Sequence, residues 1–247
     1  MADVPIGLEK VRAANAMCHA ELDALITDLA RTTRLAARLL TNASIALHQN
    51  DLALAGRVIS ERDQLKVMHD DMELRCITLL TRRSPAIGDL QVVVAALPAV
   101  GHLKRMGDLA RHIALLARLK HPTPMSSGKV RSVLARMSLL ASQFAEDAAS
   151  ALERQDPLSG SRLAVADDEV DALRRHLFGI LFAEDWSHSV EQAVDAALLG
   201  RYYERFADHA VAIARQACTL AAGRSAVRAY PLPECEPAAC QARPRSY

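Results

Sequence analysis

Two acidic residues, Glu204 and Asp208, are the strongest candidates for chemistry in this sequence. They lie in the stretch Tyr202–Ile213, whose composition is typical of a helix. A spacing of four residues places both carboxylates on one face of a helix. The neighbours on that face are mostly apolar, with Val194 on one side and Val211 on the other. Carboxylates in line with an apolar stripe need a cation or a partner, so the pair predicts an ionic site.

The same pattern occurs earlier in the chain. The stretch Gly101–Ile113 repeats four residue types of the later helix at an offset of 100, namely Arg105 and Arg205, Asp108 and Asp208, Ala110 and Ala210, Ile113 and Ile213. A second match, at an offset of 105, pairs residues 57–66 with residues 162–171. Two matches of this kind indicate an internal duplication.

The later copy of the second match is rich in acids. Asp167 and Asp171 are four residues apart, and Asp168 lies between them. In an antiparallel bundle this helix lies beside the one that carries Glu204 and Asp208. Carboxylates that converge without cations repel one another, and a divalent or trivalent metal ion with oxygen ligands relieves the repulsion. The five acids therefore predict a metal site. Two alternatives remain, which are pairing with Arg174, Arg201 or Arg205, and a patch for docking a partner.

The first half has a different charge pattern at the equivalent positions. Arg62, Lys66 and Lys104 replace Asp167, Asp171 and Glu204. Asp63 and Asp108 remain acidic. This set predicts an internal ion-pair cluster. The alternative is a basic pocket for an anion such as phosphate, although no glycine-rich loop accompanies it.

Composition restricts the elements that position these residues. The chain has 247 residues, and 51% of them are apolar but only 4% aromatic, which favours long helices over sheets. A net charge of +1 provides no basic field for nucleic acid. No secretory signal is visible. The longest apolar run is far shorter than the roughly 20 residues that span a bilayer. An odd number of cysteines suits a reducing compartment. We expect a cytoplasmic protein.

The apolar periodicity predicts six helices separated by Gly, Pro and polar breaks. They cover residues 8–48, 52–80, 89–119, 130–154, 159–182 and 189–222, and Ser187 or Ser189 is expected to cap the last one. The predicted fold is all-α, with two tandem antiparallel three-helix bundles. Residues 1–120 form the first repeat, 121–128 a linker and 129–223 the second repeat. The tail, residues 224–247, is expected to be disordered, and its Cys235 and Cys240 are expected to be a spare pair rather than a metal site or disulfide.

Three segments together resemble the PhoU family: residues 204–209 (Glu-Arg-Phe-Ala-Asp-His), 104–108 (Lys-Arg-Met-Gly-Asp) and 84–90 (Ser-Pro-Ala-Ile-Gly-Asp-Leu). The run 198–211, preceded by Trp186-Ser-His188, looks most like the actinobacterial branch. The resemblance covers residues of about 10 to 222 in both repeats.

The resemblance implies two tandem three-helix bundles, each with an acid-x-x-x-Asp motif that holds metal ions in some members. Glu204 and Asp208 match this motif, and Asp167, Asp168 and Asp171 match the acidic stretch of the preceding helix. The implied cofactor is iron, manganese, zinc or magnesium in the second repeat. Asp108 matches in the first repeat, but Lys104 departs from the acid, which puts metal binding there in doubt.

The resemblance also implies a function. PhoU proteins act as adaptors, not as enzymes, and are thought to link the ATPase subunit of the phosphate ABC transporter to a sensor histidine kinase. They damp phosphate uptake and the phosphate-starvation response when phosphate is plentiful. The implied protein is a homodimer that reaches the membrane only through its partners.

The competing interpretation is a metal-dependent helical-bundle enzyme, either an oxidase or a phosphohydrolase. No glutamate is followed by histidine three residues later, which argues against a ferritin-like oxidase. The dipeptides His69-Asp70 and Asp208-His209 could indicate a phosphohydrolase. However, adjacent helix residues point about a third of a turn apart, so we expect no pairing within them.

Other polar residues are expected to have ordinary roles. The histidines His102, His112 and His176 are expected to be helix residues rather than ligands. The arginines Arg31, Arg34 and Arg38 are expected to form a solvated positive face, with docking onto an acidic partner as the alternative.

Overall fold

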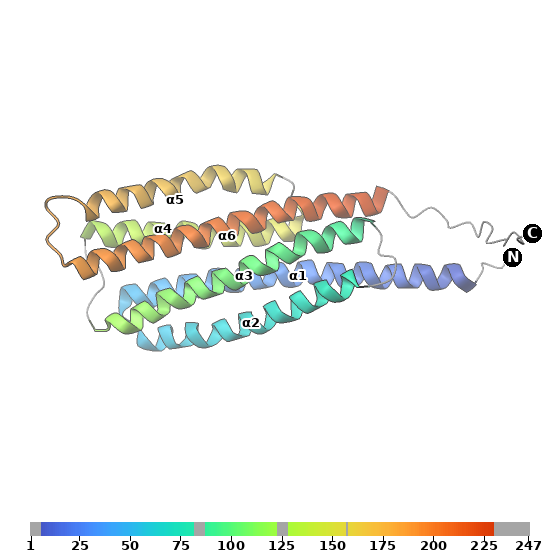
Figure 1. Ribbon diagram of the computed structural model, residues 1–247, viewed down its shortest axis with the longest axis horizontal. Coiled ribbons are helices and arrows are strands. Elements are labelled where there is room, and N and C mark those ends of the chain that lie inside the picture. The colour runs from blue at the N-terminus through green and yellow to red at the C-terminus, as the bar shows by residue number, and fades with distance from the viewer. Residues whose placement is uncertain (1–5, 82–86, 123–127, 157, 230–247) are drawn as a thin grey trace, which may run out of the picture.

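The computed structural model contains six helices in the residues that it describes, which are 6–81, 87–122, 128–156 and 158–229. The helices are α1 (Ile6–Gln49), α2 (Leu52–Leu80), α3 (Ile87–Lys120), α4 (Gly128–Arg154), α5 (Ser159–Leu181) and α6 (Val190–Ala229). No strand occurs in these ranges. The all-α prediction is therefore confirmed (Figure 1).

Local sequence signals explain the starts of two helices, α2 and α6. Asp51 caps α2 by accepting a hydrogen bond from the Leu54 amide at 2.9 Å. Ser189 and Gln192 form a capping box before α6, with each side chain bonded to the other residue's backbone N–H at 3.1 Å. Of the two expected caps, Ser189 is the one that the structure uses.

One predicted helix end is wrong. We expected α6 to stop at about Ala222, but it continues through Gly223 to Ala229. A single glycine costs a helix only about 1 kcal/mol, which the rest of the helix can tolerate. Most of the predicted linker (residues 123–127) and of the predicted tail (residues 230–247), including Cys235 and Cys240, lies outside the described residues.

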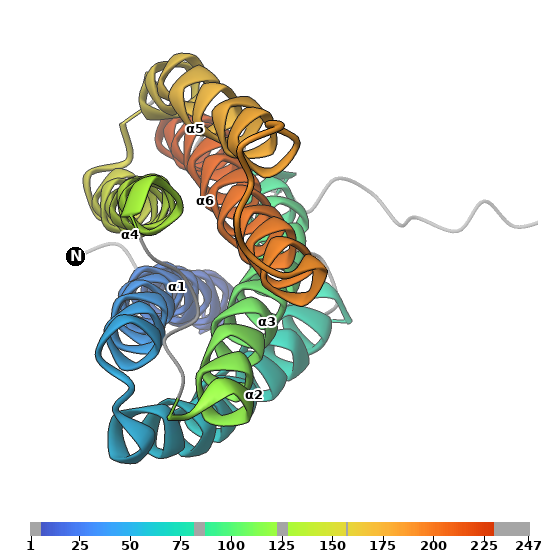
Figure 2. The same cartoon turned by 90° about the vertical axis from the view of Figure 1, so that its left-hand side faces the viewer.

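The helices form two antiparallel three-helix bundles, as predicted. Viewed along the long axis, α1, α2 and α3 group on one side and α4, α5 and α6 on the other (Figure 2). The two bundles are joined along α3 and α6, which run in opposite directions, and along α1 and α4 (Figure 1). Tyr203 and Phe206 of α6 are among the largest fully buried side chains.

Polar contacts also join the two repeats. Lys120 at the end of α3 pairs with Glu191 and Asp195 at the start of α6. A buried chain of hydroxyls connects three helices, because Ser138 donates to Ser44 at 2.7 Å and Ser44 lies 3.0 Å from the Tyr203 hydroxyl.

The arginines of α1 do not all form a free positive face. Arg34 pairs with Glu153 of α4, with a second contact to Glu146 at 3.5 Å. Arg31 and Arg38 are exposed. The expectation of a solvated face is therefore wrong for Arg34, whose partners are more than 100 residues away in sequence.

Across the described residues, no helix is both long enough and apolar enough to traverse a bilayer.

Candidate functional site

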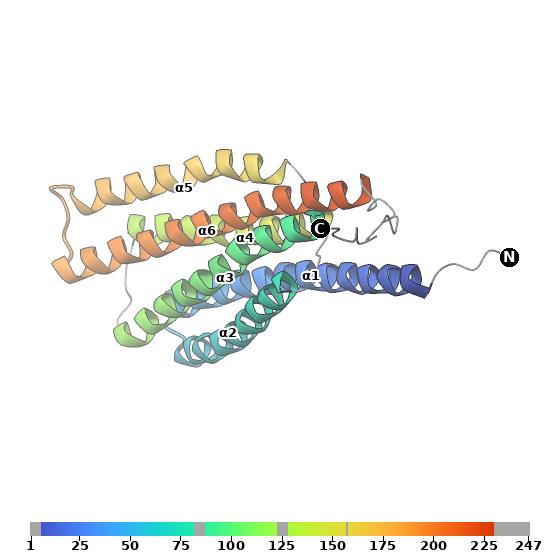
Figure 3. The same cartoon turned by 45° about the vertical axis from the view of Figure 1, so that its right-hand side comes forward.

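The acids of the second repeat lie on two neighbouring helices. The helices α5 and α6 run side by side in opposite directions (Figures 1 and 3). Two glycines allow this close approach, because a Cβ on Gly160 would lie 2.9 Å from Cα of Arg215 and one on Gly200 would lie 2.6 Å from Cδ2 of Leu177. The expected face-to-face arrangement of the two helices is present.

Four aspartates of these helices interact electrostatically. Partial burial raises the pKa of Asp167 to about 6, and the charges of Asp208, Asp171 and Asp168 raise it further against the opposing effect of Arg215. The pKa of Asp208 is also raised, first by burial and then by Glu204 and Asp171. The site therefore holds more negative charge than its neighbouring cations neutralise.

Glu204 differs from these aspartates because it already has partners. Its side chain is buried and pairs with Arg201 at 2.6 Å and with Arg174 of α5 at 3.3 Å. The Nε atom of Arg174 is buried without a hydrogen-bond partner. The expected apolar neighbour Val194 is half exposed rather than part of the core. Of the acid-x-x-x-Asp pair, only Asp208 remains without an arginine within ion-pair distance in the described residues.

The donor atoms of the predicted metal ligands lie too far apart to bind one metal ion without side-chain movement. Asp168 and Asp171 are exposed on α5. Within the described part of the chain, no three His, Cys, Asp or Glu side chains of the second repeat bring their donor atoms within 4.8 Å of one another. Binding of a metal ion there requires side-chain rotation of the exposed carboxylates.

The first repeat is neutralised internally around Arg62. Its Nε donates to Oδ1 of Asp108 at 3.0 Å, and its guanidinium lies 3.6 Å from Asp63. Lys66 and Lys104 are exposed and act instead on Asp70, a residue outside the predicted cluster. This geometry favours the ion-pair interpretation over an anion pocket for Arg62, Asp63 and Asp108.

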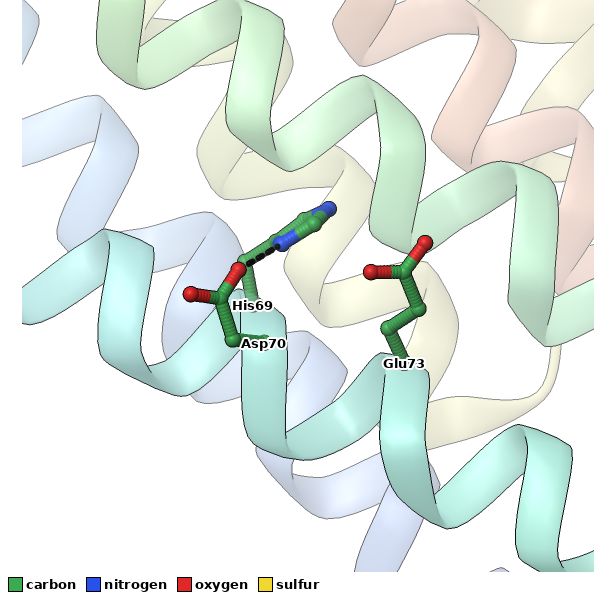
Figure 4. Close-up of side chains that lie close together, drawn as sticks. All are labelled: His69, Asp70 and Glu73. Carbon is green, nitrogen blue, oxygen red and sulfur yellow. Dashed lines mark hydrogen bonds and ion pairs between the residues drawn. The ribbon is translucent and has the colours of Figure 1, made fainter.

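A group that we did not predict lies two turns further along α2. His69, Asp70 and Glu73 place one donor atom each within 4.8 Å of one another (Figure 4). His69 Nδ1 is 2.9 Å from Oδ1 of Asp70, so the expectation that adjacent residues do not pair is wrong here. Side-chain rotation brings the two groups together although their Cβ atoms diverge. The spacing His-Asp-x-x-Glu was the signal available in the sequence.

The three histidines that we expected to be ordinary helix residues lie against another ring or are exposed. His102 of α3 lies against His209 of α6, with their Nδ1 atoms 3.0 Å apart. The ring of His112 is tilted against Tyr202, with ring centroids 5.5 Å apart. His176 is exposed. The prediction that His102 is an ordinary helix residue overlooked its position between the repeats.

The fold and its ionic clusters define a tandem three-helix-bundle protein with unequal sites at equivalent positions of its two repeats. The PhoU domain model matches residues 29–117 and 134–217, one match in each repeat. The chain belongs to the PhoU family.

Known proteins of this family are similar over most of the chain. A Mycobacterium tuberculosis protein, phosphate-specific transport system accessory protein PhoU homolog 2, is 37% identical over 205 residues, which are 83% of this chain and 96% of that protein. PhoU homolog 1 of Mycobacterium leprae is also 37% identical, over 92% of its length.

Solved structures agree on the fold. The crystal structure of PhoU from Pseudomonas aeruginosa superposes with a TM-score of 0.74 at 25% identity, covering 83% of this chain and 99% of that one. The regulatory protein PhoU from Streptococcus pneumoniae has the same fold, with a TM-score of 0.71 at 22% identity, over 82% and 96% of the two chains.

Proposed function

We propose that this protein is a regulator of phosphate transport that damps phosphate uptake and the phosphate-starvation response when phosphate is plentiful. The observation that carries this proposal is the 37% identity, over nearly the full length, to proteins named as accessory proteins of the phosphate-specific transport system. The names of these relatives, which describe accessory proteins of a transport system, favour an adaptor over the oxidase or phosphohydrolase alternative.

The proposal includes specific partners. The protein would bind the ATPase subunit of the phosphate ABC transporter and a sensor histidine kinase, and would work as a cytoplasmic homodimer that reaches the membrane through them. The family resemblance supports these partners. Long helices with many exposed polar side chains supply the surface that two different partners need.

Deletion of the gene tests the regulatory role. We expect phosphate-uptake genes to be expressed in high phosphate in the deletion strain, and repression to return with the wild-type gene. The measurement is transcript level at high and low phosphate. Unchanged expression in high phosphate would contradict the proposal, and affinity purification that recovers the transporter ATPase or the kinase tests the partners separately.

We also propose that the second repeat binds iron, manganese, zinc or magnesium. The specific observation is that Asp167 and Asp171 on α5 and Asp208 on α6 are near enough for their charges to interact. The pKa values of Asp167 and Asp208 are raised first by burial and then by repulsion from neighbouring acids. A metal ion would relieve this repulsion through oxygen ligands. Asp168 is exposed, as are Asp171 and Asp208, and Glu204 would join only by leaving Arg174 or Arg201.

Metal analysis tests this second proposal. Protein purified without chelator is expected to contain metal by mass spectrometry, and Asp208→Ala is expected to contain less of it. The matched control Asp147→Ala removes an exposed aspartate from α4 and is expected to keep it. Metal-free wild-type protein, or equal metal in Asp208→Ala, would contradict the proposal.

A further inference from the structure

The group His69, Asp70 and Glu73 on α2 combines one nitrogen donor with two carboxylates. His69 is buried, while Asp70 and Glu73 are exposed (Figure 4). In the described residues, this is the single group of three or more His, Cys, Asp or Glu side chains whose donor atoms lie within 4.8 Å of one another. We propose that it binds one divalent transition-metal ion, separately from the acidic site of the second repeat.

The geometry suits a metal ion of this kind. Metal–nitrogen and metal–oxygen bonds of about 2.1 Å at the tetrahedral angle of zinc place two neighbouring donors about 3.4 Å apart. His69 Nδ1 and Asp70 Oδ1 are hydrogen-bonded at 2.9 Å, so a bound ion replaces the shared hydrogen after a small movement of the exposed Asp70 side chain. Packing fixes the His69 ring, because its side chain is 6% exposed, and the exposed Glu73 completes the set by a rotation of its side chain. Three ligands on one helix leave the remaining positions to water.

The second repeat has no equivalent of this site. At the offset of 105 between α2 and α5, the positions of His69, Asp70 and Glu73 are occupied by Arg174, Arg175 and Phe178. Conversely, Arg62 and Lys66 occupy the positions of the acids Asp167 and Asp171. The candidate metal ligands of the two repeats therefore do not occupy equivalent positions. Those on α2 lie about two helical turns further along the helix than the positions that match the acids of α5.

The donor types also separate the two sites chemically. A histidine nitrogen favours zinc, nickel or cobalt, whereas a site made only of carboxylates suits magnesium or manganese. Lys66 and Lys104 act electrostatically on Asp70, and an incoming ion has to compete with them. We therefore expect weaker binding than at a structural zinc site with four protein ligands.

Calorimetric titration of the full chain with zinc chloride, after chelator treatment, tests the proposal. The background is Asp167→Asn/Asp171→Asn/Asp208→Asn, which removes three of the five candidate acids of the second-repeat site. We expect one zinc ion per chain, and affinity at least about tenfold lower in Glu73→Gln and in Asp70→Asn. Both changed residues are exposed, so the variants are expected to fold. Circular dichroism checks this.

Asp71→Asn is the matched control, because Asp71 is the adjacent aspartate, equally exposed and outside the group. It is expected to bind zinc as the background does. No zinc binding by the background protein would overturn the proposal, as would equal affinity of Glu73→Gln and Asp70→Asn to the background. Magnesium is expected to give no heat at the same concentrations, and magnesium binding as tight as zinc binding would also overturn it.

Discussion

Asp167 is a partly buried carboxyl group surrounded by other acids. Its pKa is raised from 3.8 to about 6, first by burial and then by Asp208 and Asp171. The folded state therefore binds a proton at Asp167 more tightly than the unfolded state does. This contribution to stability is complete below about pH 4 and is lost as the pH rises through 6.

Asp167→Asn is therefore expected to stabilise the metal-free protein above pH 6. Because the group is only partly buried, we expect the free energy of unfolding to rise by about 1 kcal/mol at pH 7.5 and to change little at pH 4. Urea denaturation at both pH values measures this. Asp168→Asn, which removes the exposed neighbour, serves as control, and an equal effect of the two variants would contradict the assigned cause.

Four-residue spacing and helix pairing are visible in sequence and indicated which charged residues lie on neighbouring helices. Lys66 and Lys104 nevertheless act on Asp70 rather than on the acids around Arg62, and metal binding in the second repeat stays a prediction. Individual partners were harder to predict. Arg34 pairs with Glu153, and Lys120 pairs with Asp195, each across two different helices. These pairs depend on how far the two helices are shifted along each other, which the local sequence does not indicate. The contact of His69 with Asp70 depends on side-chain rotamers, which the sequence does not specify.

At the scale of elements, helix boundaries followed from polar breaks and prolines. The bounds of α2 agree with the expected residues, and those of α1, α3, α4 and α5 agree within two residues. The end of α6 was missed because Gly223 weakens a helix without ending it. Breaks that contain proline were reliable, since proline removes a backbone donor and restricts the preceding residue.

The capping box at the start of α6 leads to a prediction at this scale. Ser189→Ala removes the acceptor for the Gln192 N–H and is expected to lower the free energy of unfolding by about 1 kcal/mol. Chemical denaturation measures the change. Ser187→Ala is the control, because Ser187 was the other candidate cap and is exposed. A larger loss in Ser187→Ala would show that the cap is assigned to the wrong serine.

For the whole molecule, the contact of His102 with His209 links the repeats. Burial, the His102 ring and then Arg205 and Arg105 lower the pKa of His209 to about 4, and burial lowers the pKa of His102. Histidines with depressed pKa values in the folded state contribute stability that is complete above about pH 6.5. This stability is lost as the pH falls towards 4.

His209→Gln is therefore expected to make the free energy of unfolding depend less on pH below about pH 6.5. We expect the wild-type protein to lose about 1 kcal/mol more than the variant between pH 7 and pH 4.5, after allowance for partial exposure. Thermal unfolding across this range measures the difference. His176→Gln, at an exposed position on α5, is expected to follow the wild-type curve. Parallel curves for His209→Gln and wild type would contradict this assignment.

The links between the repeats have a mechanical consequence. They are distributed along the shared interface, from Lys120 with Glu191 and Asp195, through Ser44 with Ser138 and Tyr203, to His102 with His209. A hinge needs one flexible point with few contacts on either side of it, and this interface has contacts at several heights. We expect the two repeats to move together as one rigid body when a partner binds. A signal would then pass between partners through a change in the position of the whole molecule, rather than through one repeat opening away from the other.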